Sequence, residues 1–377
     1  MDRIYLDTNA TSPLAPAVKS WLAKGDFVFA NPASQHSSGK KSAFLLDEVR
    51  DFLFSLFQLD QKKYDLFFHS GATEGVNTFS LSRGPDPSAL FVYAPTDHAC
   101  VRLQKERFNQ SCELRINEQG ELLLEESIEA INAFKSKNIL LNFTWVHNET
   151  GVIWPLALAL ALKERTGAMV HVDAPQAIGK IKDWHQISSE LDMYSFSSHK
   201  CGALKGHGWS FVKKKSLSPL MLGGGQQQKL RSGTENTMAA MALMQALDEL
   251  HQNWKPEASL RVMQEIRHFL DQSLLGVGAR VCAQARELNT NTALFYFDSL
   301  PSDQTLPLFD LAGLELSSGA ACSSGAAKES HVLQALGLSA YAKNALRLSL
   351  NWDFSSDDWG KLQPRLLQVI EKIKAKT

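Results

Sequence analysis

The chain has 377 residues, of which 44% are hydrophobic and 21% are charged, a composition ordinary for a soluble globular protein with a large core. Its formal net charge of −1 provides no general attraction to nucleic acid or to an acidic membrane, so we expect neither as a partner. The longest apolar run, 156–162, is too short to span a bilayer, and we expect no secretory signal ahead of the strand-like residues 4–6. Five cysteines without a CxxC pair favour reduced thiols and a cytoplasmic location.

Short apolar runs alternate with helix-like stretches from about residue 40 to about residue 250. This alternation is typical of an α/β protein with a mainly parallel sheet that helices cover on both faces. Ligands of such sheets bind beyond the carboxyl ends of the strands. We predict strands at 66–68, 90–93, 139–146, 169–172, 193–196 and 209–212, and helices at 42–57, 156–165 and 235–252.

The pattern changes near residue 254. A helix is predicted at 258–274, a strand at 292–297, and a final helix at 355–374 that Pro364 should kink. We therefore predict a large domain over 13–253 and a smaller α+β domain made of 1–12 and 254–377.

An aspartate and a lysine each follow a predicted strand. Asp173 ends the strand at 169–172, and Lys200 comes after the strand at 193–196, with room for one crossover between them. The pair suits pyridoxal phosphate, because a lysine amine forms its Schiff base and a carboxylate keeps its pyridine nitrogen protonated. Alone, the pair is weak evidence, since a lysine after a strand is usually a solvated charge.

Two loops could hold an anion. Residues 69–74 (HSGATE) join a strand to a helix-like stretch, where main-chain N–H groups and the Thr73 hydroxyl could bind a phosphate. The alternative is an ordinary turn with Thr73 as the helix N-cap. Three glycines at 223–225 precede Arg231, Ser232 and Thr234, which could grip an anion or simply cap the next helix. The chain has no Walker motif and no GxGxxG, so nucleotide binding has no support.

Cys322 lies among serine, glycine and alanine in 317–325. A structural cysteine usually sits among large apolar residues, so this composition indicates an exposed loop, where the thiol is reactive if its thiolate is stabilised. The alternative is an inert surface cysteine.

Arg347 interrupts the apolar run 346–350 and needs a partner if it is buried. It could bind a substrate carboxylate with two hydrogen bonds, or it could lie on the solvent face of a half-buried strand. His98 follows a strand and could stack on a flat cofactor, although such a histidine is more often structural. Neither HExxH nor paired Cys/His spacing supports a metal site.

Together these segments resemble the cysteine desulfurases, which are class V aminotransferases within the fold-type I pyridoxal-phosphate enzymes. The resemblance runs in order through nearly the whole chain, and the loop around Cys322 is similar to that of the NifS and IscS group. It implies a large domain with a mainly parallel seven-stranded sheet and a smaller α+β C-terminal domain. The matching segments are 5–11 (YLDTNAT), 31–34 (NPAS), 70–74 (SGATE), 148–151 (NETG), 171–176 (HVDAPQ), 195–200 (SFSSHK), 231–234 (RSGT), 317–322 (SSGAAC) and 347–350 (RLSL).

The resemblance also implies a role for each candidate residue. Lys200 would form the Schiff base with pyridoxal phosphate, and Cys322 would take the substrate sulfur as a persulfide, leaving L-alanine from L-cysteine. His98 would stack on the ring and transfer protons. The remaining cofactor contacts would be Asp173 to the pyridine nitrogen, Gln176 to the ring oxygen, and Ala72, Thr73, Ser197 and His199 to the phosphate. The substrate carboxylate would be held by Asn148 and Arg347.

Thr234 would reach the phosphate of the other subunit's cofactor, which implies an obligate homodimer. A sulfur-acceptor protein is expected, for iron–sulfur assembly, tRNA thiolation or a specialised role. The chain departs from the family at Ser198, at 202–204 (GAL) and at Asn351, and it ends soon after its last helix, where housekeeping members carry a tail that docks a scaffold protein. Two alternatives are a selenocysteine lyase or another class V β-lyase, and a non-catalytic regulatory relative.

Overall fold

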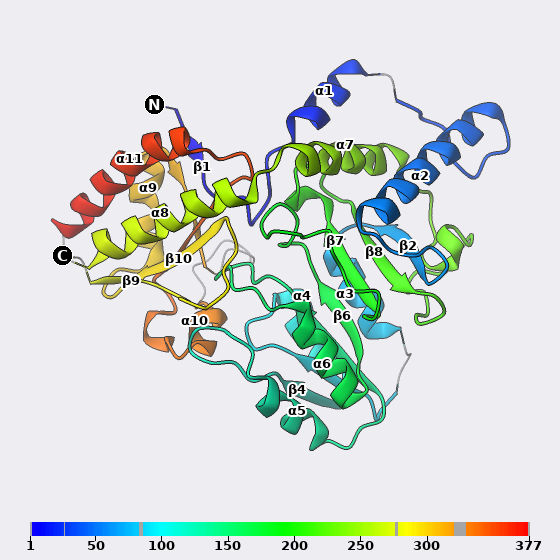
Figure 1. The fold of residues 1–377 in the computed structure, drawn as a ribbon, viewed down its shortest axis with the longest axis horizontal. Coiled ribbons are helices and arrows are strands. Elements are labelled where there is room, and N and C mark those ends of the chain that lie inside the picture. The colour runs from blue at the N-terminus through cyan, green and yellow to red at the C-terminus, as the bar shows by residue number, and fades with distance from the viewer. Residues whose placement is uncertain (1, 26, 83–85, 276–277, 320–328, 376–377) are drawn as a thin grey trace.

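The central sheet forms from the short apolar segments of the first two thirds of the chain. The computed structural model describes residues 2–25, 27–82, 86–275, 278–319 and 329–375 (Figure 1). Within them the sheet has seven strands in the order β2-β8-β7-β6-β5-β3-β4. Strand β8 runs antiparallel to both neighbours and the other pairs are parallel, which confirms the predicted mainly parallel sheet. The strands are β2 (Tyr64–His69), β3 (Leu90–Tyr93), β4 (Gln110–Glu113), β5 (Ile139–Thr144), β6 (Met169–Asp173), β7 (Met193–Ser197) and β8 (Gly208–Lys213).

Helices cover both faces of this sheet, and side-chain alternation along each strand assigns them. On β2, Phe67 packs into one hydrophobic cluster with Val76 and Phe79 of α3, whereas Leu66 and Phe68 belong to the cluster on the opposite face. That opposite face carries residues of α1, α2, α5, α6 and α7. The helices of this part are α1 (Pro16–Lys24), α2 (Ser37–Leu56), α3 (Ala72–Leu81), α4 (Ala99–Arg102), α5 (Leu124–Asn132), α6 (Leu156–Thr166) and α7 (Thr237–Asn253), with 3-10 turns at Leu103–Arg107, Ser198–Lys200 and Gln227–Lys229.

A second, antiparallel sheet with the order β12-β13-β10-β9 lies in the last third of the chain. Helices α8, α9 and α11 pack on it around a separate hydrophobic cluster, to which the N-terminal Leu6 also contributes (Figure 1). The smaller α+β part of the predicted fold is therefore confirmed, and the exact boundaries at 13, 253 and 254 stay a prediction. The elements are β1 (Ile4–Tyr5), α8 (Pro256–Leu274), β9 (Ala279–Val281), β10 (Thr292–Phe297), α9 (Ser302–Leu311), β11 (Leu314–Glu315), β12 (Ser317–Ser318), α10 (His331–Ala335), β13 (Ala345–Ser349) and α11 (Ser356–Lys374), with a 3-10 turn at Ser339–Tyr341.

The predicted strands agree with the observed strands to within two residues at each end. Strand β4 (Gln110–Glu113) was not predicted, because it is a polar edge strand that pairs with β3 alone. Helix α2 begins five residues before the predicted start, because the His36 side chain accepts a hydrogen bond from the Gly39 N–H at 3.2 Å and caps the helix there. In the described residues no helix is long and apolar enough to cross a membrane.

Phe57, Phe196 and Phe211 form an aromatic cluster that packs on one face of the central sheet. We expect this cluster to contribute strongly to the stability of the fold. Phe57 has no exposed surface and its ring lies 5.1 Å from that of Phe196 and 5.2 Å from that of Phe211. Phe57→Ala should therefore lower the free energy of unfolding by about 3–5 kcal/mol. Phe134→Ala is the matched control, since Phe134 is 41% exposed. Equal losses for the two variants in chemical denaturation would contradict this account of the core.

Candidate active site

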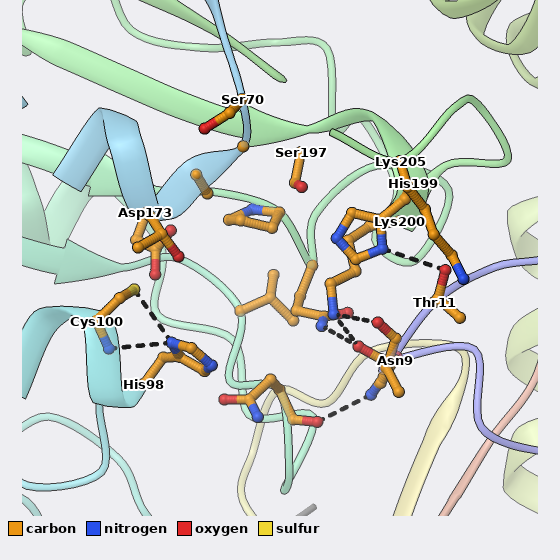
Figure 2. Close-up of a pocket in the computed structure, with 18 of the residues that line it drawn as sticks. Asn9, Thr11, Ser70, His98, Cys100, Asp173, Ser197, His199, Lys200 and Lys205 are labelled. Carbon is orange, nitrogen blue, oxygen red and sulfur yellow. Dashed lines mark hydrogen bonds between the residues drawn. The ribbon is translucent and has the colours of Figure 1, made fainter. Parts of the chain in front are cut away.

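A cavity of about 640 Å³ opens at the carboxyl ends of β5, β6 and β7 (Figure 2), the edge where parallel sheets bind ligands. This volume suits a cofactor-sized molecule. The cavity brings together most of the residues predicted for the site, from segments distant in sequence. Those that line it are Ala72, Thr73, His98, Asn148, Asp173, Gln176, Ser197, His199 and Lys200.

Lys200 ends a 3-10 turn that follows β7 directly. Its amine points into the cavity and donates hydrogen bonds to the main-chain oxygens of Asn9 and of Ala10, the latter at 2.8 Å (Figure 2). The backbone turns at Ser198–Lys200, so the segment that carries Lys200 and Cys201 is not extended. The Cys201 thiol is buried and donates to the Ser198 carbonyl at 3.2 Å.

Asp173 ends β6 and is nearly buried at the cavity wall. Its Oδ1 has no hydrogen-bond partner among the described residues. Burial, and then the negative charge of Asp97, raises the pKa of Asp173 to about 7, although Lys200 opposes the shift. A buried carboxylate oxygen without a partner is costly, so the site needs a donor there. A protonated pyridine nitrogen is such a donor, and the geometry fits pyridoxal phosphate.

The part of the cavity wall formed by the start of α3 suits a phosphate. Helix α3 begins at Ala72, so the first main-chain N–H groups of the helix face the cavity, and Thr73 adds a hydroxyl. Ser197 and His199 line the same cavity from the end of β7. Gly75 lets the helix approach β7 closely, because a Cβ at this position would lie 2.3 Å from the Ser195 hydroxyl.

His98 caps α4 by accepting a hydrogen bond from the Cys100 N–H at 3.2 Å. Burial, followed by the positive charges of Lys200 and His331, lowers the pKa of His98 to about 4. The ring is therefore neutral at physiological pH and can accept a proton. Cys100, which was not predicted for the site, lines the cavity beside His98 with its thiol 3.1 Å from Nδ1 (Figure 2).

Arg347 lies in β13 with 1% of its surface exposed, so the alternative of a solvent-facing arginine is wrong. Its guanidinium forms an ion pair with Asp7 at 2.6 Å and donates to the Ser317 hydroxyl at 3.0 Å and to the Asn148 carbonyl at 3.2 Å. Its Nε has no partner among the described residues. Arg347 does not itself line the described cavity, but Asn148, whose carbonyl accepts its hydrogen bond, does.

Cys322 and Thr234 are the other two predicted residues. Cys322 is outside the described residues; strand β12 (Ser317–Ser318), which precedes it in the sequence, pairs with β13, with Ser317 opposite Arg347. Thr234 is exposed and does not line the cavity of its own chain. Within the described residues no group of His, Cys, Asp and Glu could hold a metal.

Asn9 is another residue of the site that the sequence analysis missed. It is 1% exposed, and its main-chain oxygen accepts hydrogen bonds from Lys200 and from Gln176. Its side-chain Nδ2 donates to the Asn148 carbonyl at 3.0 Å and to the Thr292 hydroxyl at 2.8 Å. The segment 5–11 was recognised as a motif, but hydrogen bonds between distant segments leave no signal in a single sequence.

Comparison with known proteins agrees with this geometry. Residues 4–359 match the family described as aminotransferase class-V, and the chain belongs to this family. It is 32% identical to a cysteine desulfurase of Cereibacter sphaeroides, over 100% of this chain and 97% of that one. It is also 32% identical to a cysteine desulfurase of Gluconacetobacter diazotrophicus, over 100% and 94% of the two chains. The structure of a NifS-like protein from Rickettsia africae superposes with a TM-score of 0.85 at 24% identity, covering 98% of this chain and 99% of that one. The predicted fold-type I architecture and the pyridoxal-phosphate cofactor are thereby confirmed.

The buried Asp173 should make the stability of the cofactor-free protein depend on pH. Its pKa is about 7 in the folded chain and about 3.9 when unfolded, so the folded state loses stability as the pH rises from about 4 through about 7. Asp173→Asn cannot ionise. Its melting temperature, measured by calorimetry without cofactor, should therefore rise relative to wild type between about pH 4 and about pH 8. A constant difference across this range would show that Asp173 is not buried in this way.

Proposed function

We propose that this protein is a pyridoxal-phosphate-dependent cysteine desulfurase that converts L-cysteine to L-alanine and passes the sulfur to Cys322. The observation that carries the proposal is the cavity that joins Lys200, the N-terminus of α3 and an Asp173 oxygen for which the described residues provide no partner. Full-length identity of 32% to proteins named cysteine desulfurase supports the choice of reaction, and a neighbouring structure described as SspA in complex with cysteine has a TM-score of 0.74.

The residues of the cavity divide the work of holding the cofactor. Lys200 binds it covalently, and Asp173 keeps its pyridine nitrogen protonated. Ala72 and Thr73 offer the N–H groups of α3 to its phosphate, together with the polar side chains Ser197 and His199. When bound, the cofactor ring accepts the electron pair of a bond broken at the substrate α-carbon.

The substrate is held and its protons are moved by three other groups. Asn148, which lines the cavity, and Arg347, which donates to the Asn148 carbonyl, would bind the cysteine carboxylate. Among the described residues the Nε of Arg347 has no partner. His98 would face the cofactor ring from the cavity wall. Its pKa of about 4 leaves the imidazole neutral at physiological pH. It can therefore accept a proton from the substrate and return one.

Cys322 completes the reaction as the sulfur acceptor. Its thiolate attacks the sulfur of the bound cysteine, so that an S–S bond forms while the carbon–sulfur bond breaks. The electron pair of the broken bond stays on the carbon, which takes up a proton and becomes the methyl group of alanine. The enzyme is left with a persulfide, and a thiol of an acceptor protein can then remove the outer sulfur.

We propose a homodimer in which Thr234 of one subunit reaches the phosphate site of the other, since Thr234 is exposed and away from its own cavity. The large domain would comprise 13–253, and 1–12 with 254–377 would form the small domain that carries Arg347 and the Cys322 loop. The protein would work in the cytoplasm, in keeping with free thiols at the cysteines that the structure describes, Cys100, Cys112, Cys201 and Cys282.

The reaction is tested by incubating the protein with L-cysteine and measuring alanine and sulfide. Cys322→Ser should still bind pyridoxal phosphate but should lose alanine release by at least about 100-fold, because a serine hydroxyl is not ionised near neutral pH and accepts sulfur poorly. Without reductant, the wild-type peptide that contains Cys322 should gain one sulfur atom, seen by mass spectrometry and removed by dithiothreitol.

Cys112→Ala is the control, since Cys112 is buried in edge strand β4, away from the cavity. It should turn over cysteine as the wild type does. The proposal fails if Cys322→Ser releases alanine at the wild-type rate, or if the extra sulfur is found on Cys201.

A further inference from the structure

Lys180 is a buried lysine to which neither the sequence analysis nor the proposed reaction gives a role. It is 4% exposed, one turn beyond Gln176 in the loop that follows β6. It forms no ion pair within the described part of the chain; its amine instead donates to the Gln176 side-chain oxygen and to the Asn9 side-chain oxygen, the latter at 3.1 Å. Burying a lysine amine costs free energy, so the burial of Lys180 beside Gln176 and Asn9 needs an explanation.

The contacts fix which way the Gln176 amide points. Its Oε1 faces the Lys180 amine, and its Nε2 donates to the Asn9 main-chain oxygen at 3.0 Å. If the amide were flipped, its NH2 would meet the amine donors and its oxygen would meet a carbonyl oxygen, so both hydrogen bonds would be lost. Gln176 lines the cavity, and the second hydrogen of its Nε2 is not used by Asn9. The group that Gln176 can offer to a ligand is therefore a donor.

The surroundings of Lys180 also affect its titration. Burial, and then the positive charges of Lys200 and Arg347, lowers the pKa of Lys180 well below its ordinary value. The hydrogen bonds to Gln176 and Asn9 offset part of the cost of burying this amine.

We propose that Lys180 is a positioning residue that acts through Gln176: it holds the amide so that its NH2 donates to the oxygen on the ring of the bound cofactor. The inference rests on the proposed function, because it takes pyridoxal phosphate as the ligand of the cavity. It concerns the side chain alone. The main-chain oxygen of Lys180 accepts hydrogen bonds from the Thr290 N–H at 2.8 Å and the Thr290 hydroxyl at 3.0 Å, and these contacts survive substitution.

A double-mutant cycle with pyridoxal phosphate itself tests the inference. Cofactor-free wild type, Lys180→Met, Gln176→Leu and the double variant are titrated with pyridoxal phosphate, and the dissociation constant and the visible absorption maximum are recorded. Lys180→Met should weaken binding about tenfold and shift the absorption maximum, because the hydrogen bond to the ring is lost. In the Gln176→Leu background the same change should alter the dissociation constant less than about twofold, since there is no amide left to orient.

Lys182→Met is the matched control. Lys182 lies two residues further along, its side chain is 67% exposed and it forms an ion pair with Glu257 at 3.2 Å. Its substitution should therefore change neither the dissociation constant nor the absorption maximum. If Lys180→Met does not fold, as judged by circular dichroism without cofactor, Lys180→Leu replaces it in the cycle.

If Lys180→Met raised the dissociation constant tenfold in both backgrounds, the inference would be overturned. The effect of Lys180 on cofactor binding would then not depend on Gln176. An unchanged dissociation constant in Lys180→Met would overturn it too. Wild-type protein that binds no pyridoxal phosphate would instead refute the proposed function, so the two failures are distinguishable.

Discussion

The site depends on one buried asparagine. The main-chain oxygen of Asn9 accepts hydrogen bonds from Lys200 and Gln176. Its side-chain oxygen accepts hydrogen bonds from Lys180 and, at 3.1 Å, from the Asn291 amide. A residue near the N-terminus thereby connects the end of the central sheet with the second sheet. Because the alternative for each of these polar groups is burial without a partner, the network holds the cavity in one shape.

The charged and polar groups that line the cavity determine which ligand it can bind. The Lys200 amine, the Asp173 carboxyl and the neutral His98 ring all line one ligand-sized cavity. The wall also includes an Asp173 oxygen that has no partner among the described residues and the N-terminus of α3, so a suitable ligand presents a hydrogen-bond donor to the first and an anion to the second. Pyridoxal phosphate has both groups on one rigid ring.

Much of this could be predicted from the sequence, for a physical reason. Parallel strands are buried on both faces and appear as apolar runs, and the side chains that follow such runs meet at one edge of the sheet, which is how Asp173 and Lys200 were brought together. The polar edge strand β4 (Gln110–Glu113) lacks that signal. The 3-10 turn at Ser198–Lys200 was not predicted, because so short a turn leaves no periodicity to detect.

Buried polar networks were the main omission. Arg347, Asn9 and Lys180 look like ordinary polar residues in a linear sequence, and their partners are more than 130 residues away in several cases. Only the arginine was flagged, because it interrupts an apolar run. Asn9 lies in a recognised motif, yet its hydrogen bonds to residues of several distant segments become visible only in the folded chain.

The central claim is that the cavity holds pyridoxal phosphate on Lys200. Reducing the cofactor-loaded protein with borohydride and mapping the labelled peptide tests it most directly, because Lys205 also lines the cavity and Lys180 lies just behind it. The account predicts the label on Lys200 alone, and its absence from Lys200→Ala. A label on Lys180 or Lys205 in the wild-type protein, or none in protein that has bound the cofactor, would contradict it.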